Sequence, residues 1–137
     1  WGKVMARIVW PPALEAISPS LVDSTNDTSL VLRLLFQGGD SAWLAADTSE
    51  AVEEQLLKMN LVEPTTTLKV SHHGSKHATS EPFLAILQPR YFVVSVGKNN
   101  YGHPSEEVLK RVEAKRGIVK RTDKQGVIRW RPGSILY

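Results

Sequence analysis

The order of apolar and polar positions along the chain predicts an alternation of strands and helices. A stretch rich in Ser, Pro and Asp, Ala13–Asp27, is predicted to be a loop, and a Gly-Gly turn at Gln37–Asp40 is predicted to close a hairpin. Period-two or continuous apolar runs, rich in β-branched and aromatic residues, indicate strands at Lys3–Trp10, Thr28–Phe36, Ser41–Ala46, Thr67–Val70 and Tyr91–Val96.

Three other segments carry helical signals. Asp47 and Glu50 resemble a capping box, and the apolar residues that follow recur at helical spacing to about Asn60. A short helix is predicted to open at Ser80 and Pro82 and to run through Leu87, and a further helix is expected from Pro104 to near Gly117.

The last part of the chain, Ile118–Arg121 and Val127–Trp130, is predicted to form a closing hairpin. Strands alternating with helices predict an α/β fold, a mixed β-sheet with helices packed on it. The length of 137 residues suits a single domain. The chain starts at Trp1 without a basic, apolar signal segment, which favours a piece of a longer protein.

Composition narrows the chemistry that this domain can perform. The chain has no cysteine, which excludes a disulfide scaffold, a thiolate zinc site and a cysteine nucleophile. Histidine and carboxylate side chains are therefore the expected metal ligands. No apolar run approaches the roughly 18–20 residues that cross a bilayer.

Charge is distributed unevenly along the chain. Residues 110–137 carry nine Lys and Arg against two Asp and Glu, whereas residues 1–109 carry eight against twelve. Such a basic segment is typical either of a solvated helix face beside a protected strand edge or of a surface that binds nucleic-acid phosphates.

Polar groups of metal-binding type follow three of the predicted strands. Asp47 follows the third strand, His72 and His73 the fourth, and His103 closes the loop after the fifth. Ligands of α/β sheets gather beyond the carboxyl ends of strands, so we expect these groups to lie together at that edge of the sheet. Carboxylate and imidazole ligands of this kind suit zinc, manganese or iron. Asp47 and His103 also have a purely structural explanation as helix-capping or turn residues, and His77 is expected to be exposed.

The tandem histidines are followed by Gly74 and Ser75. Glycine permits a tight backbone turn beside a ligand, and the serine hydroxyl can support a ligand or bind phosphate. Adjacent residues of a strand point to opposite sides, which limits the direct metal ligands to one of His72 and His73.

An ordered set of motifs covers nearly the whole chain, from Val9 to Trp130. It resembles the C-terminal hydrolase-like domain of the ComEC family of DNA-uptake proteins, which belongs to the metallo-β-lactamase superfamily. The matching segments are Leu68–Ser75 (LKVSHHGS), Val94–Pro104 (VSVGKNNYGHP), Val9–Pro12 (VWPP), Asn26–Leu32 (NDTSLVL) and Arg121–Asp123 with Gly126.

The resemblance implies that this chain is the C-terminal half of an αβ/βα sandwich. The N-terminal half of such a domain carries an HxHxDH-like loop with most of the metal ligands, and that motif is absent here. Asp47 falls on the metal-bridging aspartate of a Thr-Gly-Asp motif, which here reads Ala45-Ala46-Asp47, and His72 falls on the last ligand histidine. His73 and His103 are then the expected catalytic residues, His103 as a phosphate contact or proton donor.

The resemblance also implies the substrate. Ser75, Lys98, Lys120 and Arg121 are expected to bind DNA. The complete domain is expected to hold a divalent metal, Zn²⁺ or Mn²⁺, and to hydrolyse the strand that is not transported. The chain alone is expected to hydrolyse DNA weakly or not at all, because Asp47 and His72 are fewer than the three protein ligands of a catalytic site.

The expected partners are DNA, the N-terminal half of the same domain, the membrane-channel portion of the parent protein, and a second copy of the chain in a homodimer. The parent is expected in the bacterial inner membrane, with this domain on the periplasmic or extracellular side. Two alternatives stay open, namely a DNA-binding module without catalysis and a hydrolase of the same superfamily that acts on a small ester or phosphoester.

Overall fold

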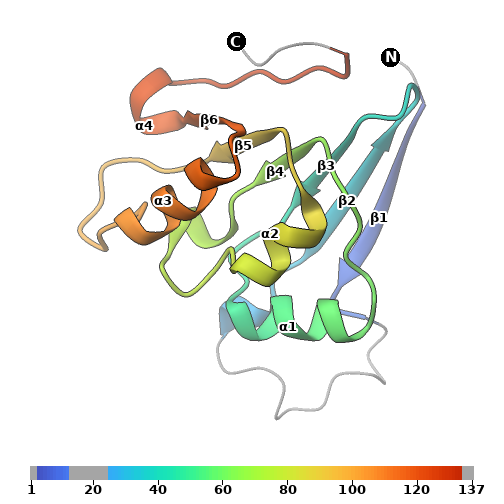
Figure 1. Cartoon of the computed structure of the whole chain (residues 1–137), viewed down its shortest axis with the longest axis horizontal. Coiled ribbons are helices and arrows are strands. Elements are labelled where there is room, and N and C mark those ends of the chain that lie inside the picture. The colour runs from blue at the N-terminus through green and yellow to red at the C-terminus, as the bar shows by residue number, and fades with distance from the viewer. Residues whose placement is uncertain (1–2, 13–24, 134–137) are drawn as a thin grey trace.

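The computed structural model describes residues 3–12 and 25–133 of the chain, and these residues form one mixed sheet with helices on it (Figure 1). The six strands follow one another across the sheet in chain order. The first three are antiparallel neighbours, and the next three pairings are parallel. The strands are β1 (Val4–Trp10), β2 (Val31–Phe36), β3 (Ser41–Leu44), β4 (Thr67–Lys69), β5 (Tyr91–Val94) and β6 (Ile118–Arg121). The expected α/β class with a mixed sheet is confirmed.

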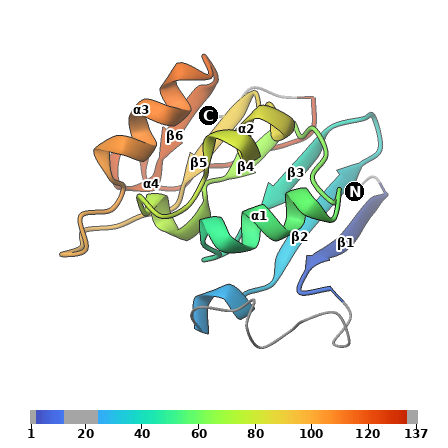
Figure 2. The same ribbon diagram turned by 60° about the horizontal axis from the view of Figure 1, so that its bottom comes forward.

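The parallel strands are joined by helices that cover one face of the sheet (Figure 2). Each crossover contains one α-helix, the usual connection between parallel neighbours. These helices are α1 (Glu50–Lys58), α2 (Glu81–Leu87) and α3 (Glu106–Ala114). Trp43 of β3 and Phe83 of α2 meet edge to face with ring centroids 5.8 Å apart, and both are buried, so the core lies between the sheet and this helical layer.

The helices begin where short polar side chains can cap them. The Ser80 hydroxyl accepts from the Phe83 N–H, and the Ser105 hydroxyl accepts from the Val108 N–H. The predicted start of the second helix is thus confirmed. Two other predicted helix starts were wrong. The residue before α1 is Ser49 and not Asp47, and Pro104 precedes the cap of α3 instead of opening the helix.

Two of the predicted strands are shorter in the structure than their apolar content suggested. Residues 25–28 form a short 3₁₀ turn, so β2 starts at Val31, and β3 ends at Leu44 because Ala46 has a positive φ of 52°. The remainder of the predicted loop, residues 13–24, lies outside the described residues.

The predicted closing hairpin was wrong. Ile118–Arg121 pairs in parallel with β5, a short helix α4 (Thr122–Gln125) follows, and residues 127–130 form no strand. The cause is Thr122, whose hydroxyl donates to the Val96 carbonyl at 2.7 Å and accepts from its N–H at 2.7 Å. These bonds fasten the chain to the end of β5, so that it does not turn back along β6.

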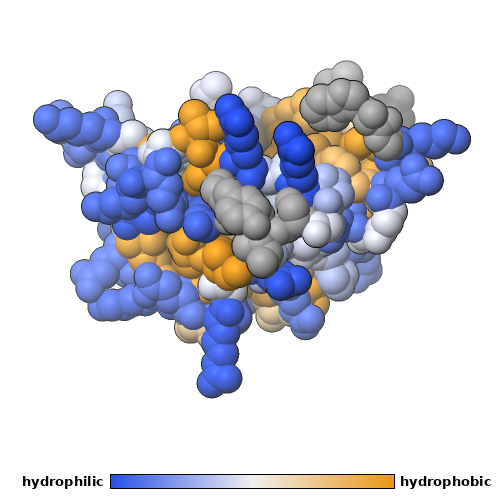
Figure 3. All heavy atoms as spheres, turned by 90° about the horizontal axis from the view of Figure 1, so that it is seen from above, coloured by the Kyte–Doolittle hydropathy of each residue, from blue (hydrophilic) through white to orange (hydrophobic). Residues whose placement is uncertain are grey.

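The chain after α4 crosses the face of the sheet that the helices leave open. Trp130 packs edge to face on Phe36 of β2 at 4.8 Å. Leu34, Leu44 and Val93 line a cavity of about 370 Å³ beneath this segment. Figure 3, which views the molecule from this side, shows apolar patches between polar side chains. The open face therefore retains an apolar character that the chain itself covers only in part.

Among residues 3–12 and 25–133, no helix is long and apolar enough to cross a membrane.

Candidate functional site

The carboxyl ends of β3, β4 and β5 lie at one edge of the sheet, because these three strands are parallel neighbours. The loops that follow them carry Asp47, the His72–His73 pair and His103. In the structure these four side chains form a cluster of two pairs, Asp47 with His73 and His72 with His103. His73 and His103 also line one cavity, so the groups gather at one edge of the sheet as predicted.

Asp47 faces His73. Its Oδ1 lies 3.4 Å from His73 Nε2, and the other ring nitrogen, Nδ1, lies 2.6 Å from the carbonyl oxygen of Ser95. A carbonyl only accepts, so Nδ1 carries the proton and donates it. In the neutral ring, Nε2 then directs a lone pair at a carboxylate oxygen. Two acceptors at this separation attract a cation between them.

The expectation that the two histidines point to opposite sides was based on a strand, and the structure has no strand there. His72 and His73 have φ values of +46° and +54°, inside a short turn over Ser71–Gly74. This left-handed backbone costs roughly 1–3 kcal/mol per non-glycine residue. It turns both rings into the same cluster, so strand geometry does not limit the direct ligands to one histidine.

His72 belongs to the other half of the cluster. Its Nε2 lies 3.4 Å from the side-chain nitrogen of Asn26, and its ring meets that of His103 edge to face at 5.6 Å. The sequence grouped His72 with Asp47 as metal ligands, whereas the structure places His73 beside Asp47. The Asn26–Asp27 motif now has a structural explanation, because the Asp27 carboxylate accepts from the Ser49 N–H in front of α1.

His103 is half-buried between aromatic rings. Tyr101 stacks on it with centroids 6.1 Å apart and an angle of 26°. Burial lowers the pKa of His103 from its ordinary value of 6.5, and the charges of His72 and His73 lower it further. Its Nδ1 is buried and has no hydrogen-bond partner among the described residues. Both effects favour the neutral form of the His103 ring.

Gly74 and Pro104 fix the distance between two loops, the one with His72 and His73 and the one with His103. A Cβ on Gly74 would lie 2.6 Å from the Pro104 Cβ, and Gly74 has a φ of +85°. The Gly74 carbonyl accepts from the Ser105 N–H at 2.8 Å. The glycine thus permits a close approach of chain to chain beneath the cluster, where the sequence had suggested an approach to a ligand.

A buried carboxylate that sequence reasoning missed holds the segment around His72 and His73 in place. Glu53 of α1 is 0% exposed. It accepts from the N–H groups of Thr79 and Ser80, at 2.6 and 2.7 Å, and from the Ser71 hydroxyl at 3.2 Å. Burial raises the pKa of Glu53 from its ordinary value of 4.5, although the hydrogen bonds oppose this. In the sequence Glu53 looks like any polar residue of an amphipathic helix.

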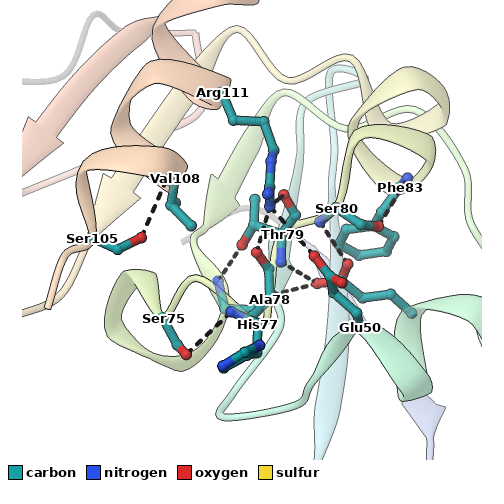
Figure 4. A network of polar contacts seen from close by, with 12 residues as sticks. Glu50, Ser75, His77, Ala78, Thr79, Ser80, Phe83, Ser105, Val108 and Arg111 are labelled. Carbon is teal, nitrogen blue, oxygen red and sulfur yellow. Dashed lines mark hydrogen bonds and ion pairs between the residues drawn. The ribbon is translucent and has the colours of Figure 1, made fainter. Parts of the chain in front are cut away.

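Arg111 of α3 completes this support (Figure 4). Its guanidinium donates to the carbonyls of Ala78 and Thr79 at 3.0 and 2.8 Å and lies 3.5 Å from the Glu50 carboxylate. The loop that leads away from His72 and His73 is therefore held by α1 and α3 together. Arg111 belongs to the basic segment of residues 110–137, so part of the positive charge of that segment serves this structural role.

The other predicted DNA-contacting residues lie in different surroundings. Ser75 is buried, and its hydroxyl accepts from the His77 N–H, while Lys98 is exposed on the loop before His103. Lys120 is half-buried and lies beside Val93 on the open face. Arg121 binds Asp123 at 2.7 Å. Lys98 thus lies near His73 and His103. Ser75 is not exposed to solvent, and the guanidinium of Arg121 is already paired with Asp123.

Lys69 is a second residue that the sequence analysis overlooked. Its Nζ donates to the carbonyl of Ala46 at 3.3 Å, directly before Asp47. Burial lowers the pKa of Lys69 from its ordinary value of 10.5, and the Asp47 charge opposes this shift. The lysine therefore lies beside the backbone of Ala46, next to the aspartate.

The donors of the cluster suit a metal, but they do not complete a site by themselves. Among the described residues, no group of three or more His, Cys, Asp or Glu side chains could hold a metal ion. A catalytic zinc ion takes at least three protein ligands. Asp47 and His73 can supply two converging ligands, fewer than such a site needs.

No protein-family model matches the chain, but three curated proteins are similar to it. ComE operon protein 3 of Bacillus subtilis is 39% identical over 118 residues, or 84% of the chain. Recombination protein 2 of Haemophilus influenzae is 30% identical over 116 residues, and competence protein ComA of Neisseria gonorrhoeae is 36% identical over 109 residues. The chain spans only about 15% of the length of each of these relatives.

Proposed function

Because the chain belongs to the ComEC family of competence proteins, we propose that it serves DNA uptake and forms one wall of a metal-dependent phosphodiester hydrolase site. The competence role rests on the three relatives. The hydrolase site rests on the geometry of the cluster, above all on Asp47 and His73.

The proposal rests on one observation, that two acceptor atoms of Asp47 and His73 face each other at the edge of the sheet. His73 donates from Nδ1 to the Ser95 carbonyl and turns Nε2 toward Asp47 Oδ1, 3.4 Å away. A histidine that ligates a metal donates its other ring N–H to a backbone carbonyl or carboxylate in the same way. The pair is therefore oriented to receive a cation, and we assign the ligand role beside Asp47 to His73.

A divalent metal at the completed site would supply a hydroxide for attack on phosphorus and would offset charge on the phosphoryl oxygens. Around it, the residues of this chain bind and orient the substrate. His103, whose lowered pKa favours the neutral ring, can donate a ring N–H to a phosphate oxygen. Lys98, which lines a cavity together with His73 and His103, adds positive charge beside the cluster.

The missing ligands are proposed to come from the N-terminal half of the same domain. The apolar open face, with Leu34, Leu44 and Val93, is the surface that such a half would cover. Packing two sheets face to face would also bring a second set of strand ends toward the Asp47 edge. The parent protein is proposed to lie in the inner membrane, with this domain on its outer side.

Metal titration tests the ligand assignment. We expect Mn²⁺ or Zn²⁺ to bind the chain weakly in calorimetry, and Asp47→Asn and His73→Gln to remove that binding. His77→Gln is the matched control, because His77 is exposed and outside the cluster. Binding that persists unchanged in both cluster variants, or that is lost equally in the control, would contradict the assignment.

Hydrolysis tests the shared site. With Mn²⁺ and single-stranded DNA, we expect cleavage when the chain is joined to the preceding segment of its parent. Asp47→Asn should reduce this cleavage by at least about 10- to 100-fold, the cost of losing even a partner that supports a metal ligand. Robust cleavage by the chain alone would contradict the proposal of a site shared between two halves. Salt-sensitive DNA binding with no cleavage in either preparation would instead indicate a binding module without catalysis.

A further inference from the structure

The loop between β5 and α3 presents an exposed aromatic ring next to the histidine cluster. The Tyr101 side chain is 84% exposed, the largest exposed fraction among the large hydrophobic side chains that the structure describes. Its ring stacks on His103 at an angle of 26°. An aromatic ring that stands in solvent beside a cluster of polar groups is a typical site for a flat ligand.

The loop holds Tyr101 in place through Asn99. The Asn99 side-chain oxygen accepts from the N–H groups of Tyr101 and His103, at 3.0 and 3.1 Å. Its nitrogen donates to the carbonyls of Gly97 and His103, at 2.9 and 2.8 Å. These bonds use both donors and both acceptor positions of the amide. The exposed ring is therefore positioned before a ligand arrives, which lowers the entropy lost on binding.

A cavity opens beside the ring. It has a volume of about 210 Å³ and is lined by His73, Val96 to Asn99, Tyr101 and His103. The exposed Lys98 lies at its edge. A stacking ring, a hollow and a cation within one loop match the combination by which proteins hold single-stranded nucleic acid, in which bases stack on aromatic rings and phosphates meet lysine or arginine.

We propose that the 97–103 loop is a nucleotide subsite, in which a base of single-stranded DNA stacks on Tyr101 and a neighbouring phosphate meets Lys98. The subsite rests on the proposed function, because it positions the DNA strand beside the cluster of Asp47, His73 and His103. Stacking recognises the flat face that every base has, so the subsite is tolerant of sequence.

The subsite can be tested without hydrolysis, by fluorescence anisotropy in the presence of EDTA. A labelled oligothymidylate is compared with an oligonucleotide of the same length whose sugars carry no bases, so that both have the same phosphates. The wild-type chain is expected to bind the oligonucleotide with bases roughly 5- to 100-fold more tightly. Tyr101→Ala is expected to abolish this preference, and Tyr101→Phe to keep it.

Two further variants separate the parts of the proposal. Lys98→Ala is expected to keep the preference for bases and to lower the slope of log affinity against log salt by about 0.7, the value for one phosphate of a single strand. Met5→Ala, which removes an exposed apolar side chain from β1, is the matched control and is expected to change neither quantity.

The outcomes distinguish the subsite from the proposed function. Wild-type chain that binds both oligonucleotides equally, or Tyr101→Ala that keeps the wild-type preference, would overturn the subsite and leave DNA binding standing. Wild-type chain that binds neither oligonucleotide would overturn DNA binding by this chain, and the subsite with it.

Discussion

The Glu53 carboxylate accepts a hydrogen bond from the Thr79 N–H at 2.6 Å, which ties α1 to the loop that follows the tandem histidines. Burial raises the pKa of Glu53 above its ordinary value of 4.5. The folded chain therefore holds this proton at pH values where the unfolded chain has released it. In that range the folded state binds more protons, so this group makes the free energy of unfolding fall as the pH rises.

We predict that Glu53→Gln lowers the free energy of unfolding by about 1–3 kcal/mol, because the Thr79 and Ser80 N–H groups donate to different carboxylate oxygens and an amide has an oxygen at only one of these positions. The gap between wild type and variant should narrow as the pH rises above 4.5, since only the wild type has the opposing proton linkage. Urea unfolding at several pH values measures both effects. Glu54→Gln, at an exposed neighbouring position, is the control, and a gap that widens with pH would contradict the argument.

Gly74 provides a second prediction, about the contact between the two histidine loops. A methyl group on Gly74 would lie 2.6 Å from the Pro104 Cβ, on a backbone with φ of +85°. Gly74→Ala should therefore lower the free energy of unfolding by roughly 2–4 kcal/mol, from overpacking and backbone strain together.

The control for this prediction is Gly39→Ala. Gly39 has a φ of +94°, but a methyl group there would meet no atom within 4 Å, so only the backbone strain applies. Denaturant unfolding of the two variants isolates the contact with Pro104. Equal destabilisation of the two variants would show that the close approach contributes nothing.

Ala46 occupies a position where the related motif has glycine, and its backbone explains why. Its φ is +52°, a conformation that glycine adopts without strain. Ala46→Gly should raise the free energy of unfolding by about 0.5–1 kcal/mol, a gain from relieved strain reduced by the entropy of glycine. Ala85→Gly, on the exposed side of α2, should have the opposite effect. A destabilising Ala46→Gly variant, measured by thermal unfolding, would refute the strain argument.

Much of the fold and the position of the candidate site could be predicted because the signals are local. Strand-sized apolar runs placed Asp47, His72 and His103 after successive strands, and parallel pairing brought them to one edge. The prediction failed where contacts between residues distant in the sequence decide the structure. Thr122 bonds to Val96, twenty-six positions away, and so replaces the hairpin that the pattern of alternation suggested.

The same reason explains what the sequence did not reveal about the site. Glu53 contacts Thr79 across a sequence separation of 26 residues, and Arg111 contacts Ala78 across 33. Nothing in their immediate neighbours distinguishes these two from surface charges. The orientation of His73 was likewise hidden, because it depends on a left-handed turn at two non-glycine residues, which local preference disfavours.

Asn99 supplies the last prediction, on how the 97–103 loop is held. Its side-chain oxygen is the acceptor for the Tyr101 and His103 N–H groups. Asn99→Ala removes that acceptor and should speed hydrogen exchange at both amides by roughly 5- to 10-fold, the equivalent of one ordinary hydrogen bond. Asn99→Asp keeps an acceptor oxygen and should retain most of the protection. Exchange measured by NMR in α3 serves as the reference, since Val112 lies in the core and should be unaffected. Unchanged exchange at Tyr101 and His103 in Asn99→Ala would mean that other contacts order the loop.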